Sequence, residues 1–269
     1  MARTGGMSPA KDYILDRKPH RAVQVQLMFG RNPPPFSNEQ QAGLSATNMA
    51  DLDETARKLM IKLVYYGPAL SGKTTNLMRL HDLLSPDLKG EIMTLETHND
   101  RTLFFDLLPL GFRTDSGWLI KLKLYTVPGQ VVHDATRKAV LSRADGVVFV
   151  ADSQRSQGIN NLESFQNLEE NVRRVGLDFE TLPLVVQFNK RDLPDVLSEQ
   201  EIRERWSAAP WPLQMASALL GEGVRETFVR LLETAYPVLD RHFSLREALG
   251  VDARSFVSAV TGEPLGNPC

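Results

Sequence analysis

The eight residues from Gly67 to Thr74 read Gly-Pro-Ala-Leu-Ser-Gly-Lys-Thr, a phosphate-binding pattern of glycine, four residues, glycine, lysine and a hydroxyl side chain. In such a loop, backbone N–H groups surround the phosphates, and the start of the next helix adds partial positive charge. Lys73 is expected to reach the β- and γ-phosphates as a catalytic cation, and Thr74 to bind Mg²⁺. The expected nucleotide contacts are Gly67, Pro68, Ala69, Leu70, Ser71, Gly72, Lys73, Thr74 and Thr75, the last of which is better suited to packing on the helix.

A second motif distinguishes GTP from ATP, which the phosphate loop by itself does not. The residues Asn-Lys-Arg-Asp, from Asn189 to Asp192, follow an apolar run. The Asp192 carboxylate can accept hydrogen bonds from guanine N1–H and the exocyclic amine, whereas adenine would leave a buried carboxylate unpaired. Asn189 is expected to tie this segment to the phosphate loop, while the Lys190 stem lies along the base. Downstream, a backbone amide at Ser217 or Ala218 can meet guanine O6.

Between these motifs, the run Thr-Val-Pro-Gly-Gln from Thr126 to Gln130 stands where Ras-like proteins carry Asp-x-x-Gly-Gln. Gly129 is therefore expected to contact the nucleotide. Thr126 replaces the carboxylate that normally steadies the water shell of the metal, so Mg²⁺ is either bound more weakly or supported elsewhere. Asp106 is the candidate substitute, and a strand carboxylate that faces solvent is the alternative interpretation.

These motifs and their flanking residues resemble the MglA-type bacterial small Ras-like GTPases, which act in gliding motility and cell polarity. The resemblance covers residues 62 to about 234 and is most specific at 62–68, 100–106, 125–130 and 146–153. It implies that the chain carries its own arginine finger, Arg101, beside a switch threonine, Thr102, which joins Thr74 at the metal. It also implies that Gln130 orients the attacking water, and that a roadblock-fold (MglB-like) protein activates the GTPase, which also binds polarity and motility effectors.

The pattern of apolar residues from residue 59 onward predicts an α/β fold, a P-loop Ras-like G domain with a six-stranded, mostly parallel sheet flanked by helices on both faces. Strands are expected at 61–66, 102–108, 118–126, 145–151, 183–189 and 212–216. Helices are expected at 73–84, 132–142, 159–175, 199–206 and 223–239. A turn at 115–117 predicts a hairpin that makes one strand antiparallel.

The regions outside this domain carry weaker patterns. Residues 1 to 58 are rich in Pro, Gly, Gln, Asn and Ser, so we expect a disordered tail, or a wrongly assigned start with the true one at Met49. Residues 59 to 240 form the expected G domain. Residues 241 to 269 are a C-terminal extension with a possible helix at 244–259.

The composition argues against several classes of protein. Lys and Arg (31) nearly balance Asp and Glu (33), and a net charge of -2 does not suit a nucleic-acid binder. The single cysteine, Cys269, cannot form an internal disulfide, and no apolar run is long enough to span a membrane. We therefore expect a cytoplasmic protein. From the motifs above, its expected ligands are GTP or GDP and Mg²⁺.

Three functions are consistent with these patterns. The leading one is a molecular switch that hydrolyses GTP slowly, with Lys73, Arg101 and Gln130 as catalytic residues. The second is a GTP-binding scaffold with little hydrolysis that docks partners through its termini, and the pair of Arg101 and Gln130 argues against it. The third, an ATP-dependent kinase, is disfavoured by the guanine motif at 189–192.

Overall fold

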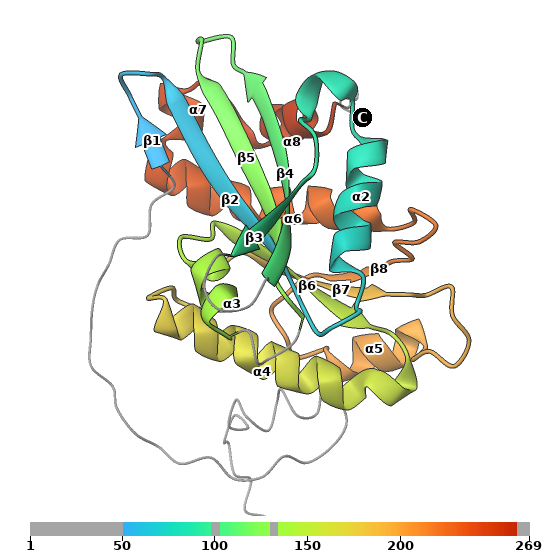
Figure 1. The fold of residues 1–269 in the computed structure, drawn as a ribbon. Helices are drawn as coiled ribbons and strands as arrows, with labels where there is room; N and C mark the ends of the chain where they lie inside the picture. Colours follow the sequence, from blue (N-terminus) through green and yellow to red (C-terminus); the bar gives the residue numbers. More distant parts are fainter. Residues whose placement is uncertain (1–50, 98–102, 130–133, 263–269) are drawn as a thin grey trace, which may run out of the picture.

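The computed structural model describes residues 51–97, 103–129 and 134–262. Its centre is a sheet with the strand order β3-β4-β5-β2-β6-β7-β8, and β1 pairs with the start of β2 (Figure 1). The strands are β1 (Asp51–Asp53), β2 (Lys58–Tyr66), β3 (Met93–Thr97), β4 (Leu103–Arg113), β5 (Leu119–Thr126), β6 (Gly146–Asp152), β7 (Leu184–Asn189) and β8 (Leu213–Met215). The strands from β5 to β8 in this order run parallel, whereas the pairs β1–β2, β3–β4 and β4–β5 are antiparallel.

The central strands are buried because their residues are almost all apolar. β6 and β7 are buried along their whole length, as parallel strands covered by helices on both faces must be. Parallel strands direct their carboxyl ends to the same edge of the sheet, where ligands bind in open α/β folds. The segments that begin at Gly67, Val127 and Lys190 therefore leave the sheet at one edge.

Helices cover both faces of the sheet (Figure 1). One face carries α2 (Lys73–Leu83), α6 (Val224–Phe243), α7 (Leu245–Ala248) and α8 (Ala253–Thr261). The other face carries α3 (Asp134–Leu141), α4 (Gly158–Arg174) and α5 (Glu199–Arg205). Leu63 of β2 belongs to the apolar cluster of the first face and its neighbour Val64 to that of the second, because successive strand residues point to opposite faces. Two short 3₁₀ helices, η1 (Pro86–Leu88) and η3 (Arg155–Gln157), lie in the connections.

An aromatic cluster fills the second face, below α4 and α5. The Phe165 ring of α4 meets the rings of Phe149, Trp206 and Trp211 near edge-on, with centroids 4.9, 5.5 and 5.3 Å apart. Such edge-to-face pairs add to the stabilisation that burial provides. The remaining tryptophan, Trp118, lies just before β5 and packs against the apolar cluster of the opposite face.

The predicted α/β fold with helices on both faces is confirmed, and so is the hairpin: Gly117 N–H donates to the Thr114 carbonyl, and β4 pairs antiparallel with β5. The predicted number of six strands is wrong, because the described residues contain two more, β1 and β3. β1 has three residues and β3 five, and both contain polar side chains. Strands this short do not show a hydrophobic alternation long enough to recognise.

The helical boundaries near the C-terminus also differ from the expected ones. The sequence predicts an end at residue 239, just after Pro237, whereas α6 continues through this proline to Phe243. A proline removes one backbone hydrogen bond from a helix, and the burial of Tyr236, Leu239 and Phe243 outweighs that cost. The single helix expected at 244–259 is two helices, because Gly250 adopts φ 72° between α7 and α8.

α8 packs on the first face of the sheet and shares its apolar cluster. The Phe256 ring is fully buried, with centroids 6.3 Å from Phe112 of β4 and 5.9 Å from Tyr236 of α6. The Tyr236 hydroxyl donates to the Val251 carbonyl at 2.9 Å. These contacts attach the C-terminal helices to the same core as the sheet.

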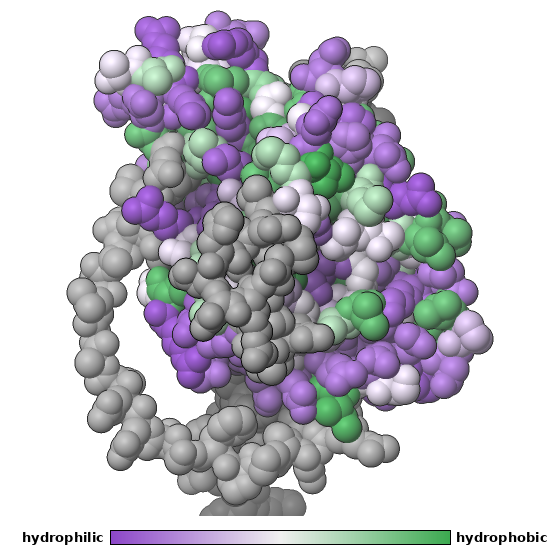
Figure 2. Space-filling model, viewed as in Figure 1, coloured by the Kyte–Doolittle hydropathy of each residue, from purple (hydrophilic) through white to green (hydrophobic). Residues whose placement is uncertain are grey.

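The surface is mostly hydrophilic on the face shown in Figure 2, and apolar side chains are scattered over it. The exposed large apolar residues include Leu70, Leu219 and Leu220, which lie in the loops at the carboxyl edge of the sheet. Among the described residues, no helix is both long and apolar enough to cross a membrane.

Phe256→Ala tests whether α8 belongs to the core. We expect the free energy of unfolding to fall by about 3–5 kcal/mol, the usual cost of removing a buried phenylalanine ring, as measured by urea denaturation. Arg254→Ala, at an exposed position of the same helix, should change it by less than about 0.5 kcal/mol. A loss below about 1 kcal/mol for Phe256→Ala would show that α8 packs only loosely.

Candidate functional site

The phosphate loop leaves β2 at Gly67 and enters α2 at Lys73. Gly67 has φ 150° and Gly72 has φ 97°, values that favour glycine. A Cβ atom at Gly67 would lie 2.2 Å from the Val150 carbonyl oxygen of β6, so a side chain cannot fit there. The glycines of the motif thus allow the loop to pass close to the neighbouring strand.

The remaining residues of the loop differ in exposure. Pro68 is buried, whereas Ala69 and Leu70 face solvent. Ser71 is buried, and among the described residues its hydroxyl has no hydrogen-bond partner. Farther along, Thr74 is exposed in the first turn of α2, and Thr75 is half-buried. The loop therefore combines two exposed residues, Ala69 and Leu70, with a buried hydroxyl.

The Lys73 side chain is buried beneath this loop, with 7% of its surface exposed. Its ammonium group donates to the Gly67 carbonyl at 3.1 Å and to the Pro68 carbonyl at 2.6 Å. Burial, and then the positive charge of Arg137, lower the pKa of Lys73 to about 7. A phosphate anion placed here would favour the charged form, because it supplies the negative charge that these carbonyls lack.

Asn189 joins three loops at the end of β7. Its Nδ2 donates to the Ser71 carbonyl of the phosphate loop at 2.8 Å, and its Oδ1 accepts from Ala218 N–H at the same distance. A Cβ atom at Gly72 would lie 2.2 Å from Asn189 Nδ2. The expected tie between the guanine motif and the phosphate loop is thus present.

The other residues of the guanine motif lie beside it. The Asp192 carboxylate is exposed and accepts a hydrogen bond from the Ser217 hydroxyl. Lys190 adopts φ 66°, and its ammonium group pairs with the Asp152 carboxylate at 2.6 Å. The structure therefore brings Asn189, Lys190, Asp192, Ser217 and Ala218 together.

Asp106 belongs to β4 and lies next to the first turn of α2. The Thr74 hydroxyl donates to Asp106 Oδ2 at 2.6 Å. Thr126 accepts from Asp106 N–H at 2.8 Å and donates to the same carboxylate at 3.2 Å, while Thr94 donates to the other oxygen at 3.2 Å. Only 9% of Asp106 is exposed, so this carboxylate does not face bulk solvent. Thr126 stands where Ras-like proteins usually have an aspartate. It thus contacts Asp106, the carboxylate that could take over the role of that aspartate.

Gly129, which follows β5, approaches the phosphate loop at Ala69. A Cβ atom at this position would lie 2.3 Å from Ala69 Cα, so only glycine allows the contact. Arg101, Thr102 and Gln130, the residues assigned to the arginine finger, the switch and the attacking water, lie outside the described residues.

Two residues of the site had no counterpart in the sequence-based prediction. Asp152, at the end of β6, holds Lys190. Arg137, on α3, is fully buried and reaches the Gly67 carbonyl at 3.3 Å. The position of Asp152 at the end of an apolar strand could have indicated it, whereas an arginine in an amphipathic helix gives no such signal.

Comparison with known proteins places this fold and site in a family. Residues 47–235 match the model of the ADP-ribosylation factor (Arf) family. The chain belongs to the Arf family. It is 44% identical over 179 residues to the mutual gliding-motility protein MglA of Myxococcus xanthus, an alignment that covers 66% of this chain and 92% of that protein. It is 26% identical over 175 residues to human ADP-ribosylation factor-like protein 4A, covering 63% of this chain and 80% of that protein.

The predicted fold, resemblance and activity are confirmed by these matches: the chain is a small Ras-like GTPase of the MglA type, which binds guanine nucleotides. The ATP-dependent kinase is thereby excluded.

Asp192→Asn tests the guanine contact of the GTPase. We expect GTP affinity to fall by about a hundredfold and preference to move toward xanthosine triphosphate, whose 2-oxo group suits an amide donor. Titration with fluorescent analogues of both nucleotides measures this. Asp195→Asn, at an exposed carboxylate nearby, is the matched control, and an unchanged GTP affinity for Asp192→Asn would place the guanine contact elsewhere.

Proposed function

We propose that this GTPase works with Mg²⁺ bound beside Thr74 and Asp106, with Thr102 as a further ligand when GTP is present. The observation that carries this proposal is the 2.6 Å contact between the Thr74 hydroxyl and the Asp106 carboxylate, directly after the phosphate loop. Asp106 would then steady the water shell of the metal, the task of the aspartate that other Ras-like proteins carry where this chain has Thr126.

The residues present fit the needs of this ion. Mg²⁺ prefers oxygen ligands and usually binds through one or two protein side chains together with phosphates and water. The described residues contain no group of three or more His, Cys, Asp or Glu side chains arranged around one point. The exposed Thr74 hydroxyl and the Asp106 carboxylate supply the oxygen atoms, and the nucleotide would supply the rest. Bound there, the ion would neutralise charge on the β- and γ-phosphates.

In the proposed reaction, water attacks the γ-phosphorus and the bond to the β–γ bridging oxygen breaks, which gives GDP and phosphate. Lys73 exchanges its hydrogen bonds to Gly67 and Pro68 for bonds to phosphate oxygens. Arg101 neutralises the charge that develops on the transferred group, and Gln130 orients the water. These two roles come from the resemblance to MglA-type GTPases and from their positions in the sequence.

The same proposal assigns the nucleotide contacts. Backbone N–H groups of the phosphate loop surround the phosphates, Gly129 approaches them from the opposite side, and Asp192 reads the base. The contact residues are Gly67, Pro68, Ala69, Leu70, Ser71, Gly72, Lys73, Thr74, Thr75, Gly129, Asn189, Lys190, Asp192, Ser217 and Ala218. This assignment is supported by the tie from Asn189 to the phosphate loop and by the buried Ser71 hydroxyl, which has no partner among the described residues.

In the cell, we propose a switch that regulates motility or polarity, because the M. xanthus relative is named for gliding motility. A roadblock-fold, MglB-like protein would activate hydrolysis, and effectors would bind the GTP form. The alternative is a scaffold that holds GTP with little turnover and docks partners through its termini. The pair of Arg101 and Gln130 favours the enzyme, since a scaffold that only binds GTP does not need groups that act in the transition state.

Asp106→Asn tests the metal site. The amide can still accept from Thr74, but it lacks the negative charge, so we expect Mg²⁺ to bind about 10–100 times more weakly to the GTP complex. Hydrolysis measured across a Mg²⁺ titration gives the shift in half-maximal concentration. Asp115→Asn, in the exposed hairpin turn, is the control. The same Mg²⁺ dependence in Asp106→Asn and wild type would remove Asp106 from the metal site.

Arg101→Ala and Gln130→Leu test the catalytic roles. Each should lower hydrolysis stimulated by a roadblock-fold partner, by about 10³-fold or more for the arginine, because both groups act mainly in the transition state. GTP affinity should stay within about tenfold of wild type, since the phosphate loop and Lys73 supply ground-state binding. Single-turnover hydrolysis and nucleotide titration separate the two effects. A normal stimulated rate for Arg101→Ala would contradict a finger supplied by this chain, whereas little stimulated hydrolysis by the unmodified chain would favour the scaffold.

A further inference from the structure

Arg137 of α3 is a fully buried cation that has no carboxylate within hydrogen-bond distance among the described residues. Its guanidinium group instead donates to three backbone carbonyls and two side-chain oxygens. The carbonyls belong to Pro128 at 3.1 Å, Gly67 at 3.3 Å and Gly129 at 3.5 Å. The side chains are Asn167 at 2.6 Å and Ser164 at 3.2 Å.

Burying a charge without a counter-ion is costly, so every donor of Arg137 must find an acceptor. Burial lowers the pKa of Arg137, and the Tyr66 ring lies below the guanidinium group, 4.5 Å from its carbon to the ring centroid. A planar group with five donors in a rigid fork can hold several carbonyls at once, which a lysine ammonium cannot do in the same geometry. The positions of these carbonyls are therefore set by the shape of one side chain.

The three carbonyls come from two segments that lie on either side of the γ-phosphate position in the proposed function. Gly67 begins the phosphate loop. Pro128 and Gly129 follow β5, and a Cβ atom at Gly129 would lie only 2.3 Å from Ala69 Cα. Arg137 thus joins the two segments at the point where their backbones nearly touch.

Lys73 donates to the same Gly67 carbonyl, at 3.1 Å. When Lys73 turns to the phosphates, that carbonyl keeps a donor because Arg137 also bonds it. The Pro68 carbonyl, which also accepts from Lys73, keeps the Ser71 N–H at 3.4 Å. The loop can then release Lys73 without leaving either carbonyl unsatisfied, which would cost about 1–3 kcal/mol.

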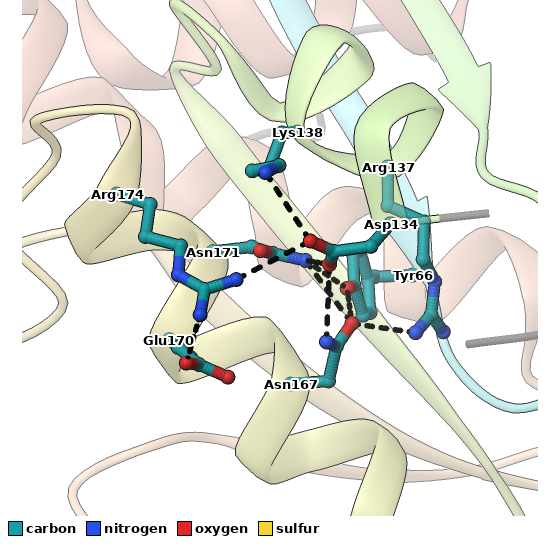
Figure 3. Close-up of polar contacts among 8 residues, drawn as sticks. All are labelled: Tyr66, Asp134, Arg137, Lys138, Asn167, Glu170, Asn171 and Arg174. Carbon is teal, nitrogen blue, oxygen red and sulfur yellow. Dashed lines mark hydrogen bonds and ion pairs between the residues drawn. The ribbon is translucent and has the colours of Figure 1, made fainter. Parts of the chain in front are cut away.

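Arg137 is itself held by α4, as Figure 3 shows. Asn167 Oδ1 accepts from Arg137 Nη1 and from the Tyr66 hydroxyl, both at 2.6 Å. Asn167 Nδ2 donates to Asp134 at 3.2 Å, and Asn171 donates to the same carboxylate oxygen at 2.7 Å. Tyr66 directly precedes Gly67, so this network links α4 to the phosphate loop by two routes.

We propose that Arg137 is a positioning residue for GTP hydrolysis, supported by Asn167: it holds the backbone of Gly129 against the phosphate loop at the spacing that bound GTP requires. The proposal rests on the proposed function, in which Gly129 contacts the nucleotide. Loss of this contact should affect steps that depend on the γ-phosphate more than it affects the binding of GDP.

Arg137→Lys and Asn167→Ala test the proposal in the full-length chain. Both should lower single-turnover GTP hydrolysis at least tenfold while GDP affinity stays within threefold of wild type. Asn160→Ala, at an exposed asparagine of the same helix whose amide donates to Gln157, is the matched control.

The possible outcomes distinguish the proposal from the function on which it rests. Wild-type hydrolysis in Asn167→Ala would overturn the positioning role, even if Arg137→Lys fails to fold. A parallel loss of hydrolysis, GDP affinity and melting temperature in Asn167→Ala would also overturn it, because that pattern marks a role in stability alone. If Lys73→Ala binds GTP as wild type does, the proposed phosphate site itself is wrong. If Lys73→Ala loses GTP while the Asn167 and Arg137 variants hydrolyse normally, the site stands and only the positioning role fails.

Discussion

The Asn189 carboxamide holds together three loops that lie far apart in the sequence. Its amino group bonds the Ser71 carbonyl and its oxygen accepts from Ala218 N–H, so both ends of the amide are used in a buried site. Gly72 has to be glycine because a Cβ atom would overlap this amide. If the amide were lost, buried backbone groups on both sides would lack partners, at about 1–3 kcal/mol each. The phosphate loop, the end of β7 and the loop at Ala218 would then no longer be held together.

The sequence predicts the central sheet well, because its strands consist of apolar runs that separate clearly from amphipathic helices. β6 and β7 are such runs, and they are buried throughout. Prediction failed where tertiary contacts decide the outcome. Pro237 led to a predicted end of α6 at residue 239, yet packing of its neighbours on the core carries the helix on to Phe243. The short strands β1 and β3 exist because longer strands beside them offer unpaired backbone groups.

The site shows the same division between local pattern and tertiary contact. The phosphate loop and the Asn189 motif are recognisable because phosphate and guanine each demand particular residue types at particular spacings. Asp106 stays the predicted substitute for the aspartate that is missing at Thr126, and the structure places the two residues in contact. Arg137 could not be inferred, because carbonyl groups are its main acceptors and every residue carries one. A sequence motif shows which side chains are present at which spacing. The contacts of Arg137 with carbonyl groups depend instead on where the fold places the backbone of another segment.

The distribution of the three tryptophans gives the protein two separate optical reporters. Trp206 and Trp211 lie in the aromatic cluster on the α4 and α5 face, whereas Trp118 lies on the opposite face near the C-terminal helices. Their emission therefore reports two different parts of the core. Replacing Trp118 with phenylalanine would leave a fluorescence signal from the α4 side alone. Comparing its unfolding curve with that of the unmodified chain would reveal whether the two faces of the sheet melt in one step.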